Sequence, residues 1–294
     1  MRQPDPSPTR RLAWLYSSTV QRPALAALLA LEREIGASVR PGLDHQVAHT
    51  RLAWWREECA RTAQGSPAHP LTRELAALFG SPAPAPVGSA PVGPAAVASA
   101  PLAGLAGFVD TAVWDLSCAT FETRRELTGY CERWSAAMIA PLVSLALPDV
   151  PTVEARALGV SLHEIELLLG LAADARSGRL RVPLDELERA QLAPGSLAQP
   201  PWPPALAELL RHRHQQLRAS LGAALDALPP TARSALRGLI VWATLAGTAS
   251  VRAERRLPRE STARDHHAPL DGWRAWRVAR RVTRSAPTHA ATER

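Results

Sequence analysis

The 294-residue sequence contains no lysine and no asparagine, so its 34 basic residues are all arginine. A chain without lysine can form no Schiff base with a carbonyl substrate or with pyridoxal phosphate. It also lacks the lysine that reaches the phosphates in a P-loop. No stretch matches the patterns G-x-S-x-G, G-x-G-x-x-G, H-E-x-x-H or C-x-x-C. Several covalent, nucleotide-binding and metalloprotease mechanisms are therefore excluded.

Cysteine is also scarce. The three cysteines, Cys59, Cys118 and Cys131, show neither metal-ligand spacing nor a disulfide framework, which favours a reducing compartment. The first eleven residues are polar and proline-rich, and they lack the apolar core of a signal peptide. The uncharged apolar run at 238–251 is too short to span a bilayer. We expect a cytoplasmic protein, soluble or peripheral at the inner membrane.

Apolar residues recur at helical spacing along most of the chain, and the alternation that is typical of strands is nearly absent. The sequence therefore predicts an all-α protein of about eight helices. Asp44 is the expected N-cap of the second helix, and Thr123 with Glu126 forms a capping-box pattern. The expected helices cover residues 25–39, 44–62, 70–80, 102–119, 123–146, 152–176, 203–227, 230–256 and 269–284.

The domain organisation follows from composition. Residues 81–101 consist of alanine, proline, glycine and other small residues, which predicts a loop inserted within one helical domain. We expect that domain to cover residues 11–284. Residues 1–10 and 285–294 are expected to be disordered.

Several sequence blocks occur in an order that matches a known family. They are RLAWWREE at 51–58, GSPAHPLTREL at 65–75, the stretch 108–138 with its F-x-T-x-x-E-L-x-x-Y-C pattern, and DARSGRLRVP at 174–183. A helix at 22–34 precedes them and a basic region at 255–281 follows. Together they resemble the squalene/phytoene synthase family. The resemblance implies a single isoprenoid-synthase-like helical bundle with a central cavity.

Active members of that family join two prenyl diphosphates, and two aspartate-rich motifs hold the Mg²⁺ ions that neutralise the diphosphates. By resemblance, the first motif should supply aspartates near positions 36, 37 and 40, where this sequence has Gly36, Ala37 and Arg40. The second should supply acids near 170, 173 and 174. Only Asp174 remains there, beside Gly170 and Ala173.

The acidic residues that remain near the expected cavity are the candidate catalytic residues: Glu34, Asp110, Asp115, either Glu164 or Glu166, and Asp174. Asp174 is the candidate metal ligand. Arginine can bind phosphate through two parallel hydrogen bonds, so Arg40 and Arg176 are candidate diphosphate ligands. We expect no cofactor, or Mg²⁺ if the protein is catalytic.

The lost aspartates favour a non-catalytic protein. The stretch from Glu32 to Glu58 resembles a branch of the family that includes the mitochondrial complex I assembly factor of squalene-synthase type. By this resemblance, the protein binds an isoprenoid or another lipid, or assists assembly of a membrane complex. The alternative is a divergent prenyltransferase that condenses two prenyl diphosphates with the remaining acids and arginines.

The positive charge is concentrated near the C-terminus. Residues 252–294 contain 11 arginines and 5 acidic residues, which leaves +6 of the net +7 in this region. The expected last helix carries five candidate membrane-contact residues: Trp273, Trp276, Arg277, Arg280 and Arg281. Tryptophan and arginine on one helix suit a membrane interface. The other interpretation packs the tryptophans into the bundle. No nucleic-acid-binding module is present, and we expect no nucleic-acid partner.

Three further motifs have structural interpretations. The Trp54-Trp55-Arg56 segment is interpreted as part of a core helix with an ion-paired arginine. Cys131 is interpreted as a buried, unreactive thiol. The histidine pairs 212/214 and 266/267 are expected at the surface without a metal.

Overall fold

The computed structural model describes residues 8–40, 42–80, 100–147, 153–261 and 268–284, and every regular element within these ranges is a helix. The prediction of an all-α protein is thus confirmed. The first elements are α1 (Pro8–Tyr16), α2 (Gln21–Gly36), the 3₁₀ helix η1 (Ala37–Val39), α3 (His45–Ala63), α4 (Pro70–Gly80) and the 3₁₀ helix η2 (Ala100–Leu105). The middle of the chain forms α6 (Ala106–Leu116), α7 (Arg124–Ala146), α8 (Val153–Leu169), α9 (Leu171–Arg176), α10 (Leu184–Arg189) and η3 (Pro194–Ala198). The last are α11 (Pro204–Ala227), α12 (Pro230–Ala235), α13 (Arg237–Arg256) and α14 (Asp271–Arg284).

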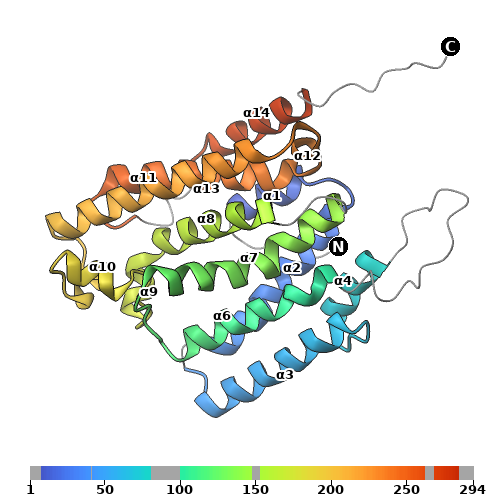
Figure 1. The fold of residues 1–294 in the computed structure, drawn as a ribbon, viewed down its shortest axis with the longest axis horizontal. Coiled ribbons are helices and arrows are strands. Elements are labelled where there is room, and N and C mark those ends of the chain that lie inside the picture. The colour runs from blue at the N-terminus through green and yellow to red at the C-terminus, as the bar shows by residue number, and fades with distance from the viewer. Residues whose placement is uncertain (1–7, 41, 81–99, 148–152, 262–267, 285–294) are drawn as a thin grey trace, which may run out of the picture.

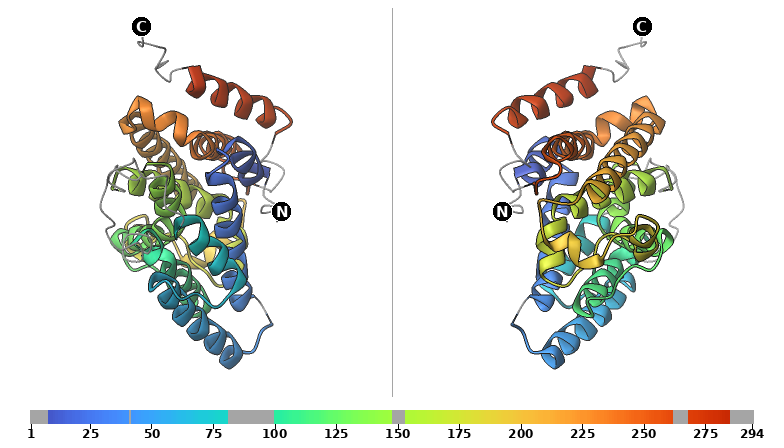
Figure 2. Two further views of the ribbon diagram at one scale, coloured as in Figure 1. Left: turned by 90° about the vertical axis from the view of Figure 1, so that its right-hand side faces the viewer. Right: turned by 90° about the vertical axis from the view of Figure 1, so that its left-hand side faces the viewer.

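The long helices form a stack with α3 at one end and α14 at the other (Figures 1 and 2). Neighbours in the stack are α3 and α6, α6 and α7, α7 and α8, α8 and α13, and finally α13 and α14. Helix α2 packs against α4, α6 and α7, whereas α1 lies against α13. Chain segments from the two halves of the sequence therefore meet in the middle of the bundle. Of the helices described, none is both long and apolar enough to cross a membrane.

The predicted helices agree with the structure apart from breaks within several of them and three elements outside the predicted ranges. The range 102–119 is divided between η2 and α6, and α10 and η3 lie outside every predicted helix. Gly170 separates α8 from α9, and Leu236 separates α12 from α13, within ranges predicted as single helices. Helix α1 was not predicted; it begins at Pro8, inside the segment expected to be disordered. The rest of that segment, residues 81–99 of the expected loop, and residues 285–294 lie outside the described residues.

The two predicted caps behave differently. Asp44 caps α3 as predicted, because its carboxylate accepts a hydrogen bond from the Val47 N–H at 3.1 Å. Helix α7 begins at Arg124 as predicted, but the Thr123 side chain makes no capping hydrogen bond. Instead, the Glu126 carboxylate accepts from the Glu122 N–H at 2.7 Å. The capping-box interpretation is therefore wrong, because the Thr123 hydroxyl accepts no capping hydrogen bond and Glu126 accepts from Glu122 and not from Thr123, although the helix start is right.

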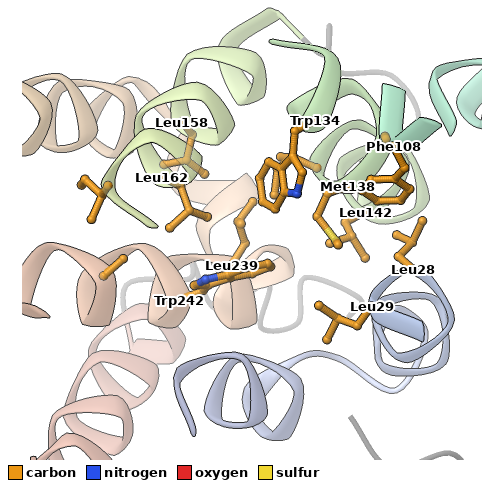
Figure 3. Packing of buried hydrophobic residues seen from close by; sticks show 14 of the residues in the cluster. Leu28, Leu29, Phe108, Trp134, Met138, Leu142, Leu158, Leu162, Leu239 and Trp242 are labelled. Carbon is orange, nitrogen blue, oxygen red and sulfur yellow. The ribbon is translucent and has the colours of Figure 1, made fainter. Parts of the chain in front are cut away.

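The core lies between α7, α8 and α13, where Trp134 and Trp242 are buried (Figure 3). Their rings meet edge to face with centroids 6.0 Å apart. Leu158 and Leu162 of α8 line the same region. Gly107 of α6 and Gly159 of α8 allow these helices to pack closely against α7. A Cβ on Gly107 would overlap the Arg133 carbonyl of α7, and one on Gly159 would overlap the Ser135 side chain.

Candidate functional site

Two of the candidate residues lie at the end of α2. Glu34 is exposed in the last turn of α2, and Arg40 is exposed just after η1. Asp110 on α6 forms an ion pair with Arg56 of α3 at 2.7 Å.

Asp115 and Asp174 are brought together, but a guanidinium lies between them. Arg181 donates to both Asp115 carboxylate oxygens at 2.7 and 3.1 Å, and to Asp174 at 2.8 Å. Arg179 donates to the other Asp174 oxygen at 3.0 Å, and the Tyr130 hydroxyl donates to Asp115 at 3.2 Å. We call these five residues the Arg181 cluster. It joins α6, α7, α9 and the segment that follows α9.

Arg181 is the buried centre of this cluster. Its side chain is only 4% exposed, whereas Asp115 and Asp174 are 17% and 21% exposed. Burial alone would lower the pKa of the guanidinium, but Tyr130 and the two carboxylates raise that pKa above its ordinary value. Burial likewise raises the pKa of the Tyr130 hydroxyl. Both groups therefore keep their protons at neutral pH.

Mg²⁺ does not fit the residues present. The arginines already use the carboxylate oxygens of Asp115 and Asp174 that a metal would need. Two acids and two arginines also leave no net negative charge to attract a divalent cation. Within the described ranges, no three His, Cys, Asp or Glu side chains are grouped so that they could hold a metal ion.

The candidate diphosphate ligand Arg176 is also engaged. It is exposed at the end of α9 and pairs with Glu260, which raises the pKa of the guanidinium through a hydrogen bond. Glu164 is buried on α8 and pairs with Arg124 of α7. Both ion pairs connect elements that are separated in the sequence.

A second polar cluster, which the sequence did not predict as a unit, lies inside the bundle. Arg10 of α1 pairs with Glu32 of α2 at 2.5 Å and with Glu166 of α8 at 2.8 Å. The Trp134 indole N–H donates to Glu32 at 2.6 Å, and that of Trp242 donates to Glu166 at 3.0 Å. The guanidinium carbon lies 5.9 and 5.1 Å from these two rings. We call these five residues the Arg10 cluster.

His163 borders the Arg10 cluster. Its ring stacks on Trp134 with centroids 4.2 Å apart, and its Nδ1 lies 3.8 Å from a Glu166 oxygen. Burial raises the pKa of Glu166, but the charge of Arg10, the nearby His163 imidazole and the hydrogen bond from Arg10 lower it to about 2. Glu166 is therefore ionised at all ordinary pH values and holds Arg10 in place.

One sequence signal for the Arg10 cluster is the pattern of a helix at the N-terminus. Pro8 stands at a favourable position for a helix start, and Leu12 and Tyr16 follow at helical spacing on a shared face. A helix at that place would carry Arg10 into the bundle. Which acids it meets could not be deduced, because Glu32 and Glu166 come from helices far along the chain.

Two pockets among the described residues are small. One is lined by Leu168, Trp202, Leu210, His214 and Leu257, and the other by Glu164, Arg181, Val182 and Arg213 together with further residues of α10 and α11. Each has a volume of about 10 Å³, which is room for about one water molecule.

The three structural interpretations have mixed outcomes. Trp55 is buried and Arg56 is ion-paired, as predicted, but Trp54 is 41% exposed. Cys131 is buried, as predicted, and burial raises the pKa of its thiol well above the ordinary value, which agrees with an unreactive thiol. His214 was expected at the surface, but it is only 4% exposed, and its Nδ1 lies 2.9 Å from the Ser250 hydroxyl. Residues 266 and 267 lie outside the described residues.

Within the described ranges the chain is an all-α bundle in which Glu32 of α2 and Glu166 of α8 both pair with Arg10 of α1. The family model for squalene/phytoene synthase matches residues 4–274, and the chain belongs to this family. No curated protein sequence matches the chain significantly.

Two solved structures support the fold. A dehydrosqualene synthase in complex with a ligand shares 16% sequence identity and a TM-score of 0.72, covering 95% of this chain and 92% of its own. The squalene synthase HpnC from Alicyclobacillus acidocaldarius shares 18% identity and a TM-score of 0.60, covering 83% of this chain and 87% of its own.

Proposed function

We propose that this chain is a non-catalytic member of the squalene/phytoene synthase family that works at a membrane-linked complex. The observation that carries the proposal is the position of Arg181, buried between Asp115 and Asp174. Prenyl coupling begins when a diphosphate leaves as an anion, and this step requires concentrated positive charge beside the diphosphate. In this chain the retained carboxylates neutralise arginines instead of holding metal ions.

The motif positions support the same proposal. The positions where active relatives are expected to carry aspartates hold Gly36, Ala37, Arg40, Gly170 and Ala173. The remaining acid of the first motif region, Glu34, is exposed. A cluster of several Mg²⁺ ions would need ligands from both regions.

The two non-catalytic roles differ in what they require of the fold. Binding an isoprenoid or another lipid inside the bundle requires a large apolar cavity, and the two pockets described above, at about 10 Å³ each, are too small for that purpose. An assembly role requires only an exposed surface. We favour a role at the periphery of a membrane-linked complex because of the resemblance to the assembly-factor branch.

The test is a diphosphate-release assay with purified protein, Mg²⁺, and farnesyl or geranylgeranyl diphosphate. We expect no release above the protein-free blank, while an active dehydrosqualene synthase serves as the positive control. Release that requires Mg²⁺ and is abolished by Asp174→Ala would refute the proposal. A thermal melt of the variant must show that it still folds.

A divergent prenyltransferase remains the second candidate, because Asp115 and Asp174 do converge from separate helices. This candidate requires Arg181 to move away from both carboxylates before a Mg²⁺ ion could bind. The same assay separates the two candidates, since only the enzyme releases diphosphate.

A further inference from the structure

Helix α14 presents two tryptophans to solvent. Trp273 and Trp276 are 51% and 43% exposed, so the interpretation that packs them into the bundle is wrong. The packed face of α14 consists of small and branched residues instead. Ala275 and Ala279 are buried against Val241 and Leu245 of α13.

The exposed tryptophans share one face of the helix with arginines. Positions 273, 276, 277 and 280 follow the i, i+3, i+4, i+7 spacing of a single helical stripe. Arg277 lies over the ring of Trp273 at 4.5 Å, and Arg280 lies over that of Trp276 at 4.7 Å. Leu270, 58% exposed, and Arg281 extend the same surface. We call these six residues the outward α14 face.

The negative charge of this helix is kept away from the outward α14 face. Asp271 is 7% exposed and pairs with Arg252 at 3.0 Å and with Arg274 at 2.9 Å. Burial raises the pKa of this carboxyl, but hydrogen bonds from Arg252, the Ala268 N–H and Arg274 lower it below its ordinary value. The charged groups on the outward α14 face itself are all arginines.

The position of α14 makes this face available to a flat surface. The helix lies at one end of the stack, and its far side faces away from every other helix drawn (Figure 2). Helix α3 lies at the opposite end. A planar partner could therefore contact α14 without meeting the rest of the bundle.

We propose that the outward α14 face docks on a bilayer surface that contains anionic lipids. Indole rings favour the interface between headgroups and acyl chains, and guanidinium groups pair with lipid phosphates through two hydrogen bonds. Each arginine near an anionic surface adds to the attraction. A nucleic acid would use the guanidinium groups but would give the two exposed indoles no apolar region to enter. The proposal rests on the membrane role given under Proposed function.

The test measures co-sedimentation of the full chain with vesicles of phosphatidylcholine, with and without phosphatidylglycerol. We expect binding only to the anionic vesicles, weakening as salt is raised. Arg277→Glu with Arg280→Glu should weaken binding at least tenfold, since two attractive charges become repulsive. Trp273→Ala with Trp276→Ala should weaken it several-fold and remove the fluorescence quenching caused by brominated lipid.

Matched controls lie elsewhere on the molecule. Trp54 is 41% exposed on α3, with Arg61 at 5.8 Å from its ring, so Trp54→Ala removes a comparable pair at the opposite end. Arg125→Glu with Arg133→Glu makes the same charge change on the exposed side of α7. All four variants alter exposed side chains, so unchanged thermal melts are expected.

Three results would overturn the proposal: no binding of the wild-type chain to anionic vesicles, equal losses in the control variants, or tighter binding to an RNA oligonucleotide at the same salt concentration. None of them bears on diphosphate release. Conversely, Mg²⁺-dependent turnover would refute the non-catalytic role without altering the vesicle result.

Discussion

Replacing Arg181 with methionine removes the cation of the Arg181 cluster while keeping most of the volume of its stem. The Arg181 side chain is 4% exposed. Its removal leaves the carboxylates of Asp115 and Asp174, which are 17% and 21% exposed, without this partner. Removing one partner of a buried ion pair costs about 3–5 kcal/mol. Both carboxylates reach some water and Asp174 keeps Arg179, so we expect the lower end, about 3 kcal/mol.

Urea unfolding at pH 7 measures this loss. The triple variant Arg181→Met, Asp115→Asn, Asp174→Asn removes the stranded charges, so we expect it to recover most of the lost stability. Mg²⁺ should raise the unfolding midpoint of Arg181→Met and leave the wild type unchanged, because only the variant exposes converging carboxylates. A loss below about 1 kcal/mol, or a triple variant no more stable than the single one, would refute the ionic account.

Three further predictions concern pH and packing. The pKa of Glu166 is lowered to about 2 from 4.5, so the stability that its carboxylate contributes is present above pH 4.5 and declines as pH falls toward 2. Urea unfolding from pH 6 to 3 should show this loss. The pH dependence of the free energy of unfolding should be weaker in Glu166→Gln. Burial, followed by the charge of Arg218, lowers the pKa of His214 to about 4 from 6.5. Because the unfolded chain then binds the proton at a higher pH than the folded chain, the free energy of unfolding should fall as pH drops from 6.5 to 4. The fall should be weaker in His214→Gln, and an equal slope would contradict this assignment. Gly107→Ala should lower the free energy of unfolding by about 1–3 kcal/mol, because the added Cβ would overlap α7. Gly129→Ala should raise that free energy slightly, because a Cβ there would have no atom within 4 Å. Thermal melts compare the two variants.

Much of the fold could be predicted because its signals are local. The Asp44 cap, the apolar spacing of α7 and the glycine that ends α4 each depend on a few neighbouring residues. The breaks at Gly170 and Leu236 were missed because the apolar pattern continues across both positions. The pattern reports which face is buried, and it does not report where the backbone changes direction.

The site was harder to predict because its partners are distant in sequence. Arg176, Arg179 and Arg181 stand within one short segment, and spacing alone could not decide which of them faces the retained acids. The turn at Gly178, with φ of 84°, places Arg181 inside and leaves Arg176 at the surface. Arg10 and Glu166 are 156 positions apart, so their pairing depends on tertiary packing.

The Arg10 cluster also has a consequence for the order in which a nascent chain can complete its bundle. Helix α1 lies against α13, where Arg237 donates to the Tyr16 carbonyl across 221 positions at 2.9 Å. During synthesis the N-terminal portion leaves the ribosome long before α13 exists. Until residue 242 has emerged, Arg10 lacks one of its two indoles and Glu166 lacks its indole donor. The Arg10 cluster is therefore completed only after most of the chain has been translated.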